Sequence, residues 1–173
     1  MRQVALLRGI NVGGRNKVPM AELRAVVEKA GMTNVRTVLA SGNVVFDAET
    51  DPAESAGVLE RAVGEAFGYD AAIHVVPLET VRAAVEGYPF PRSPERHAYA
   101  VFVTDPATLR TLAAAAPEDS DLERVRPADG LLYWEVEKGS TLSSPFGTLT
   151  GRKHAGIVTT RNLQTLEKVL AAG

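Results

Sequence analysis

Short apolar runs alternate with helix-like repeats along the first half of the chain. Residues 4–7 (VALL) form an apolar run that predicts a buried strand. Between Pro19 and Gly31, apolar residues recur every three or four positions, which predicts a helix that begins near the proline and ends at the glycine. By the same criteria, the remaining elements expected in this half are strands at 35–39 and 44–46, a helix at 52–67 and a strand at 72–76.

The order of these elements, βαββαβ, is that of a ferredoxin-like unit, in which two helices cover one face of an antiparallel sheet. In such a unit the first and second strands run in the same direction. The loop after the first strand, residues 9–18, should therefore lie beside the tight turn at residues 41–43, because both leave the sheet at the same end.

The second half repeats the pattern in part. After a short helix at 78–86 and a proline-rich connector, the chain is expected to form a strand at 99–104, a helix at 106–116, and a hairpin of strands 122–126 and 131–136 across a turn at 127–130. Residues 139–156 are polar and small, consistent with a loop that contains one short helix. We expect Thr159 or Thr160 to cap a last helix with Leu163, Leu166, Val169 and Leu170 on its buried stripe. The predicted division is an N-terminal subdomain at 1–87, a connector at 88–94 and a C-terminal subdomain at 95–173.

Composition narrows the class of protein. With 173 residues and 45% hydrophobic content, the chain can build a core for one domain or two small subdomains. No apolar stretch reaches the roughly 18 to 20 residues of a membrane span, and no signal peptide is recognisable, so a cytoplasmic protein without a membrane partner is expected. The chain has no cysteine and three scattered histidines, which gives no ligand set for a metal and no cysteine nucleophile.

The net charge of −2 conceals two basic segments. Residues 1–21 contain four arginine or lysine residues and no acid, and residues 138–166 contain another four, again without an acid. The remainder of the chain therefore carries −10. These two segments are the places where an anionic partner would be attracted.

The first basic segment has the form of an anion site. A strand, a glycine-rich loop with Gly13 and Gly14, and a helix follow one another, and free backbone amides together with a helix N-terminus favour negative charge. Arg8, Arg15 and Lys17 strengthen that preference. Neither G-x-G-x-x-G nor G-x-x-x-x-G-K-[ST] is present, so dinucleotide and P-loop binding are not indicated. A surface turn with solvated charges is the simpler alternative.

The neighbouring turn and the last helix offer further candidates. Ser41, Gly42 and Asn43 suit a hairpin turn, and their hydroxyl and amide groups could complete a polar pocket beside the loop. Arg161 and Asn162 are expected at the start of the last helix, where a cation is unfavourable unless an anion is bound or an acid pairs with it. No base stands beside Ser41 in the sequence, so catalytic residues and cofactors cannot be assigned.

Several of these segments resemble one bacterial family. Residues 5–14 (ALLRGINVGG), Lys17 and Met20, residues 41–46 (SGNVVF) and residues 159–162 (TTRN) are similar to the family called domain of unknown function 1697. The resemblance implies an α+β protein with two ferredoxin-like, βαββαβ-type subdomains whose antiparallel sheets pack into one compact unit. It implies no activity or ligand. The chain departs from the family pattern at residues 39–40 and at Leu163.

Three functions are consistent with these observations. The first is the binding of an anionic, phosphate-bearing ligand such as a nucleotide or a nucleic-acid backbone. The second is an enzyme that acts on a phosphorylated substrate, and the third is a protein–protein interaction scaffold. The oligomeric state is not indicated. The predicted ligand-binding residues are Arg8, Asn11, Gly13, Gly14, Arg15, Lys17, Ser41, Gly42, Asn43, Arg161 and Asn162.

Overall fold

The computed structural model describes residues 1–173. The chain folds into two compact units. The first unit comprises Met1–Val85 together with Gln164–Gly173, and the second comprises Glu86–Leu163. Each unit is built on its own four-stranded antiparallel sheet. The predicted α+β class with two ferredoxin-like subdomains is therefore confirmed.

The first unit has the expected βαββαβ order. Its elements are β1 (Arg2–Arg8), α1 (Met20–Lys29), β2 (Thr33–Val38), β3 (Asn43–Asp47), α2 (Pro52–Phe67) and β4 (Ala72–Pro77), followed by α3 (Leu78–Glu86). The strand order in the sheet is β2-β3-β1-β4, with every neighbouring pair antiparallel. Because β1 and β2 are each antiparallel to β3, they run in the same direction, as predicted.

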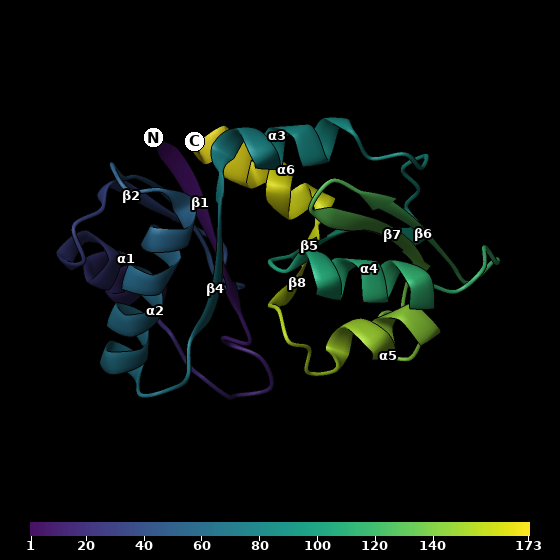
Figure 1. Ribbon diagram of the computed structural model, residues 1–173, viewed down its shortest axis with the longest axis horizontal. Coiled ribbons are helices and arrows are strands. Elements are labelled where there is room, and N and C mark those ends of the chain that lie inside the picture. Colours follow the sequence, from purple (N-terminus) through teal and green to yellow (C-terminus); the bar gives the residue numbers. More distant parts are fainter. The chain divides into compact units, whose positions relative to one another are not determined.

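Both faces of this sheet are buried. Helices α1 and α2 lie on one side of β1 and β4, and α3 with the final helix α6 (Leu163–Ala172) lies on the other (Figure 1). Alternate residues of β1 divide between these layers: Ala5 and Leu7 join the core under α1 and α2, while Val4 and Leu6 face the opposite side and are equally buried. Strand β1 is thus a central strand with neither face open to solvent.

Helix starts in both units follow a common local rule. Asp51 before Pro52, Asp105 before Pro106 and Ser144 before Pro145 each accept a hydrogen bond from a backbone N–H one turn into the helix, at 2.9, 2.7 and 3.0 Å. The capping side chain satisfies a donor that the helix itself cannot pair, and proline at the first helical position fixes the required φ.

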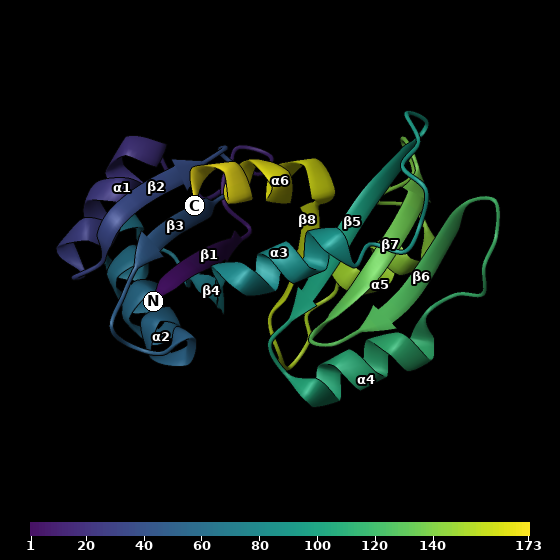
Figure 2. The ribbon, with the colours of Figure 1, turned by 90° about the horizontal axis from the view of Figure 1, so that it is seen from above.

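The second unit repeats the ferredoxin-like topology. Its elements are β5 (Arg96–Val103), α4 (Pro106–Ala115), β6 (Glu123–Ala128), β7 (Leu131–Glu137), α5 (Pro145–Gly151) and β8 (Val158–Asn162). The strand order, β6-β7-β5-β8, is equivalent to that of the first unit (Figure 2). Trp134 lies in its core with 1% of its surface exposed, so the Tyr133-Trp134 pair of β7 is not an open stacking surface.

The end of the chain differs from the sequence-based prediction. Thr159 or Thr160 was expected to cap the last helix, but both lie within strand β8, which pairs with β5 and leads directly into that helix. Helix α6 then begins at Leu163, and from Gln164 onward it belongs to the first unit rather than to a C-terminal subdomain at 95–173. Its last turn is fixed there, because Arg36 Nη1 of β2 donates to the Ala172 carbonyl at 3.2 Å.

The connector is also more ordered than its proline content suggests. Phe90 is 7% exposed, and the guanidinium of Arg124 lies 4.6 Å from the centre of its ring. This segment is therefore part of the packed second unit. No helix in either unit combines the length and the apolar character that crossing a membrane requires.

Candidate functional site

The loop between β1 and α1, residues 9–18, is here called the glycine loop, and its tip is a miniature hairpin. Arg15 N donates to Val12 O at 3.0 Å, and Asn11 N donates to Asn16 O at 3.0 Å. Gly13 and Gly14 occupy the two central positions with φ of +57° and +75°. Two consecutive positive φ values are what a type I′ turn demands, and glycine meets that demand at little steric cost.

Asn11 holds this hairpin in place. Its Nδ2 donates to Val18 O at 3.0 Å and to Ala40 O at 2.8 Å, and its Oδ1 accepts from Val18 N at 2.8 Å. One side chain thereby joins both ends of the glycine loop to the turn between β2 and β3. These hydrogen bonds fix the shape of the loop, and the predicted contact of Asn11 with a ligand stays a prediction.

The turn between β2 and β3 lies against the loop, as the topology predicted. Leu7 N donates to Gly42 O at 2.9 Å. A Cβ atom placed on Gly42, which has a φ of +87°, would lie 2.7 Å from Ile10 Cδ1 and 2.9 Å from Leu7 Cβ. Only glycine fits this contact, because any side chain would displace the first residues of the loop.

Asn43 and Ser41 complete the support beneath the loop. Asn43 is fully buried, and its Nδ2 donates to Val38 O at 2.8 Å and to Ser41 Oγ at 3.1 Å. A buried amide of this kind must be hydrogen-bonded, and these contacts hold the hairpin closed. Both residues were predicted as ligand contacts, and the structure places them in the framework that holds the turn.

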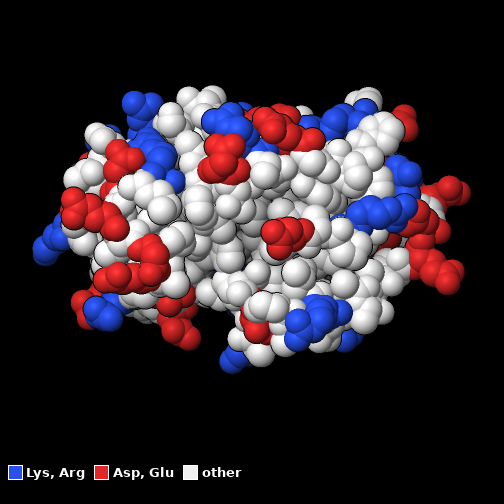
Figure 3. Space-filling model, turned by 45° about the horizontal axis from the view of Figure 1, so that its top comes forward, with Lys and Arg blue, Asp and Glu red and all other residues white.

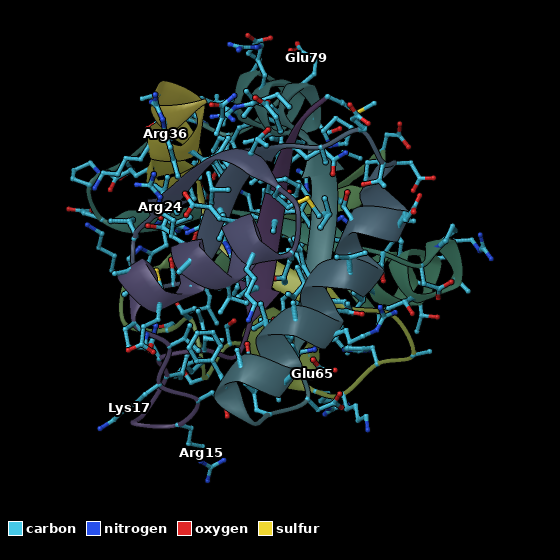
Figure 4. All side chains as sticks on the ribbon, turned by 90° about the vertical axis from the view of Figure 1, so that its left-hand side faces the viewer. Arg15, Lys17, Arg24, Arg36, Glu65 and Glu79 are labelled. Atoms are coloured by element: carbon cyan, nitrogen blue, oxygen red, sulfur yellow. The ribbon has the colours of Figure 1, made fainter.

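The cations of the glycine loop are displayed to solvent. Arg15 and Lys17 are exposed, extend outward from the same side of the loop (Figure 4) and form no ion pair. The backbone N–H groups of Gly13 and Gly14 at the tip form no hydrogen bond within the chain. Arg8 lies half-buried at the base of the loop. The loop therefore offers two exposed cations and two unpaired amide donors, with no carboxylate among its residues.

Surface charge elsewhere is mixed. On the face shown in Figure 3, acidic and basic side chains are interspersed, and neither sign gathers into one large field. The acid-free character of the glycine loop is consequently a local property. A ligand attracted to it would recognise a few contacts rather than a broad basic surface.

Arg161 and Asn162 are the last two residues of β8, and helix α6 begins at the next residue, Leu163. Arg161 is 6% exposed, and its Nη1 donates to Thr159 Oγ1 at 2.8 Å and to Thr160 O at 3.0 Å. Burial lowers the pKa of the Arg161 guanidinium to about 10, which still leaves it charged at neutral pH. That these two residues share a site with the glycine loop remains a prediction.

Two buried carboxylates in the second unit were not singled out from the sequence. Glu123 Oε2 accepts from the Trp134 indole at 3.0 Å, and its Oε1 accepts from Phe146 N at 3.1 Å. Glu135 is 2% exposed and accepts from Arg124 at 2.8 and 2.9 Å. Both residues lie in strands, where alternation alone does not show whether a glutamate faces solvent or the core. Their hydrogen bonds hold neighbouring elements of the second unit together.

Comparisons with known proteins agree with this architecture. The family model described as Protein of unknown function (DUF1697) matches residues 1–133, and the chain belongs to that family. Among solved structures, the chain resembles the conserved bacterial protein SP0830 from Streptococcus pneumoniae. The two share 24% sequence identity and a TM-score of 0.77, over 99% of this chain and 97% of that one. At this identity the likeness concerns the fold. The search of curated proteins finds no match.

Proposed function

We propose that this protein binds phosphate-bearing ligands, a nucleotide or the backbone of a nucleic acid, through the glycine loop of its first unit. The observation that supports the proposal is that the backbone of the loop is held in place while its cations have no acidic partners. Asn11, Asn16 and Gly42 hold its shape, whereas Arg15 and Lys17 have no partner of opposite charge. A loop with a fixed backbone and uncompensated cations is organised before an anion arrives.

The contacts divide into two groups. Arg15, Lys17 and the amides of Gly13 and Gly14 are the proposed donors to phosphate oxygens, with Arg8 at the base of the loop. The framework residues Asn11, Ser41, Gly42 and Asn43 act indirectly, by keeping the loop in place. Phosphate groups accept several hydrogen bonds at once, and both arginine and backbone N–H groups supply them. The proposal includes a cytoplasmic location, where such ligands are present.

The test is fluorescence anisotropy of a labelled single-stranded oligonucleotide, with unlabelled nucleotides as competitors, between 50 and 200 mM salt. Each phosphate contact contributes about 0.7 to the slope of log affinity against log salt for single strands. Replacing Arg15 and Lys17 by glutamine should therefore weaken binding and lower that slope by about 1.4.

A matched control removes the same charge elsewhere in the same unit. Arg61 on α2 and Lys29 on α1 are both exposed and without ion pairs. The double variant Arg61→Gln with Lys29→Gln should retain the affinity and salt slope of the wild type. Equal losses in the two double variants would show that net charge alone attracts the oligonucleotide, and the proposal would be wrong.

A further inference from the structure

A second cluster of cations lies at the other end of the first unit's sheet. Arg2 stands at the start of β1, whereas the glycine loop follows the end of that strand. Arg2, Arg24 of α1 and Arg36 of β2 line one open cavity of about 500 Å³. In Figure 4, Arg24 and Arg36 lie close to one another beside α6, well away from Arg15 and Lys17. Glu28, Asn34, Val35, Asp47 and Gly173 complete the lining.

Two of the three arginines have acidic partners. Arg24 Nε lies 2.9 Å from Glu28 Oε1, one helical turn further along α1, and both side chains are about half exposed. Arg2 Nη1 lies 3.4 Å from Asp47 Oδ1 and donates to Asn34 O at 2.9 Å. Hydrogen bonding from Asn34, reinforced by Arg2, holds the pKa of Asp47 below its usual value, so this carboxylate is ionised at neutral pH.

Arg36 is the cation without an acidic partner. The hydrogen bond it forms is donated by Nη1 to the neutral Ala172 carbonyl at 3.2 Å, and no carboxylate lies within ion-pair distance. A guanidinium carries five N–H donors in a planar fork. Most of the fork of Arg36 therefore remains open toward the cavity that it lines.

The backbone of β2 is shaped around this cavity. A β-bulge interrupts the β2–β3 register between Thr33 and Arg36, and within it Asn34 has a φ of +49°. The bulge allows Asn34 to donate to Asp47 Oδ2 at 2.6 Å while its carbonyl accepts from Arg2. Bulges re-aim side chains and are common beside functional sites. Here Asn34 of the bulge connects Arg2 to Asp47, while Arg36 has no acidic partner.

We propose that this cavity binds the carboxylate or phosphate group of a small anionic molecule, with the Arg36 guanidinium as its principal contact. The planar fork of arginine matches both groups in a bidentate geometry. The cavity volume falls within the range of small-molecule sites, roughly 300 to 1,000 Å³. Arg24 is the second contact, because an exposed helical ion pair is weak and its guanidinium can turn from Glu28 toward a ligand. The site is independent of the glycine loop.

The experiment uses inorganic phosphate and succinate as probes of the full chain at constant ionic strength, with chloride as the reference anion. Calorimetry should detect binding of at least one probe. Arg36→Gln should weaken it at least tenfold, and Arg36→Lys should weaken it less, since it keeps the charge but loses the fork. Arg61→Gln, which removes one exposed cation from α2 of the same unit, should leave it unchanged, as should the double variant at Arg15 and Lys17.

Arg36→Gln also removes the hydrogen bond to the Ala172 carbonyl, and this loss could disturb α6. A second measurement therefore uses the wild-type protein. In NMR spectra of the wild-type protein, the probe should shift the amide signals of Asn34, Val35, Arg36 and Asp47 and the side-chain Nε signal of Arg36. Failure of both probes to shift these signals would overturn the proposal. It would also be overturned if Arg36→Gln and Arg61→Gln reduced binding equally, which would indicate an adventitious ion only.

Discussion

Replacing Gly42 by alanine tests the packing that holds the glycine loop. The new Cβ would lie 2.7 Å from Ile10 Cδ1 and 2.9 Å from Leu7 Cβ, both in well-packed surroundings. Forcing a core to accept an extra methyl group costs about 1 to 3 kcal/mol. The backbone φ of +87° adds about 1 to 2 kcal/mol for any residue with a side chain. The expected loss is therefore about 2 to 5 kcal/mol, a large share of a typical total of about 5 to 15.

Gly13→Ala provides the matched control for this substitution. Gly13 also has a positive φ, of +57°, but a Cβ there would meet no atom within 4 Å. Only the backbone cost of about 1 to 2 kcal/mol then applies. Urea unfolding of both variants, followed by circular dichroism, should show Gly42→Ala less stable than Gly13→Ala by about 1 to 3 kcal/mol. Equal stabilities would refute the close contact between the turn and the loop.

Three further predictions concern individual side chains. Asn11→Ala should cost about 2 to 3 kcal/mol in urea unfolding, because three hydrogen bonds at about 1 kcal/mol each are lost; a cost below about 0.5 would contradict its role. Glu123→Ala should cost about 2 to 4 kcal/mol and alter the fluorescence of Trp134, the only tryptophan, whereas exposed Glu118→Ala should do neither. Burial lowers the pKa of His74 from 6.5 to about 4, so the unfolded chain takes up this proton first. Stability should accordingly fall as pH drops from about 6.5 to 4, by up to about 3 kcal/mol, and His74→Gln should flatten that profile; an unchanged profile in the variant would assign the loss to other groups.

The arrangement of the first unit could be predicted because its signals are local and mutually consistent. Helical spacing, Pro19 at the start of the first helix and glycines at loop positions all indicated the same βαββαβ order. The parallel course of β1 and β2 then followed from the topology alone. The parallel course predicts that the loop and the β2–β3 turn lie side by side, and the hydrogen bond from Asn11 to Ala40 confirms this prediction.

The last helix was predicted, but the strand before it could not be predicted in the same way. Threonine caps helices, but its branched side chain also favours strands, so Thr159 and Thr160 supported either outcome. Residues Val158–Asn162 form a strand because they pair with β5, which is distant in the sequence. The association of α6 with the first unit likewise depends on contacts such as that between Arg36 and Ala172, which no local pattern encodes.

Side-chain roles were harder to predict than side-chain positions. Asn11 and Asn43 were expected to contact a ligand because they lie in the polar loop and turn, yet the Asn11 amide bonds to backbone groups and the Asn43 amide bonds to Val38 O and Ser41 Oγ. Composition does not distinguish an amide that binds a ligand from one that holds a turn. The cavity around Arg36 could not be predicted from the sequence, because its three arginines come from separate elements and meet only in the folded protein.

The most direct test of the central proposal is an NMR titration of the ¹⁵N-labelled protein with a nucleotide and with a short single-stranded oligonucleotide. We expect at least one of them to shift the amide signals of Gly13, Gly14 and Arg15, with smaller changes at Ser41 to Asn43 behind the loop. If both ligands leave these signals in place, or if binding shifts only signals elsewhere in the chain, the glycine loop is not the binding site.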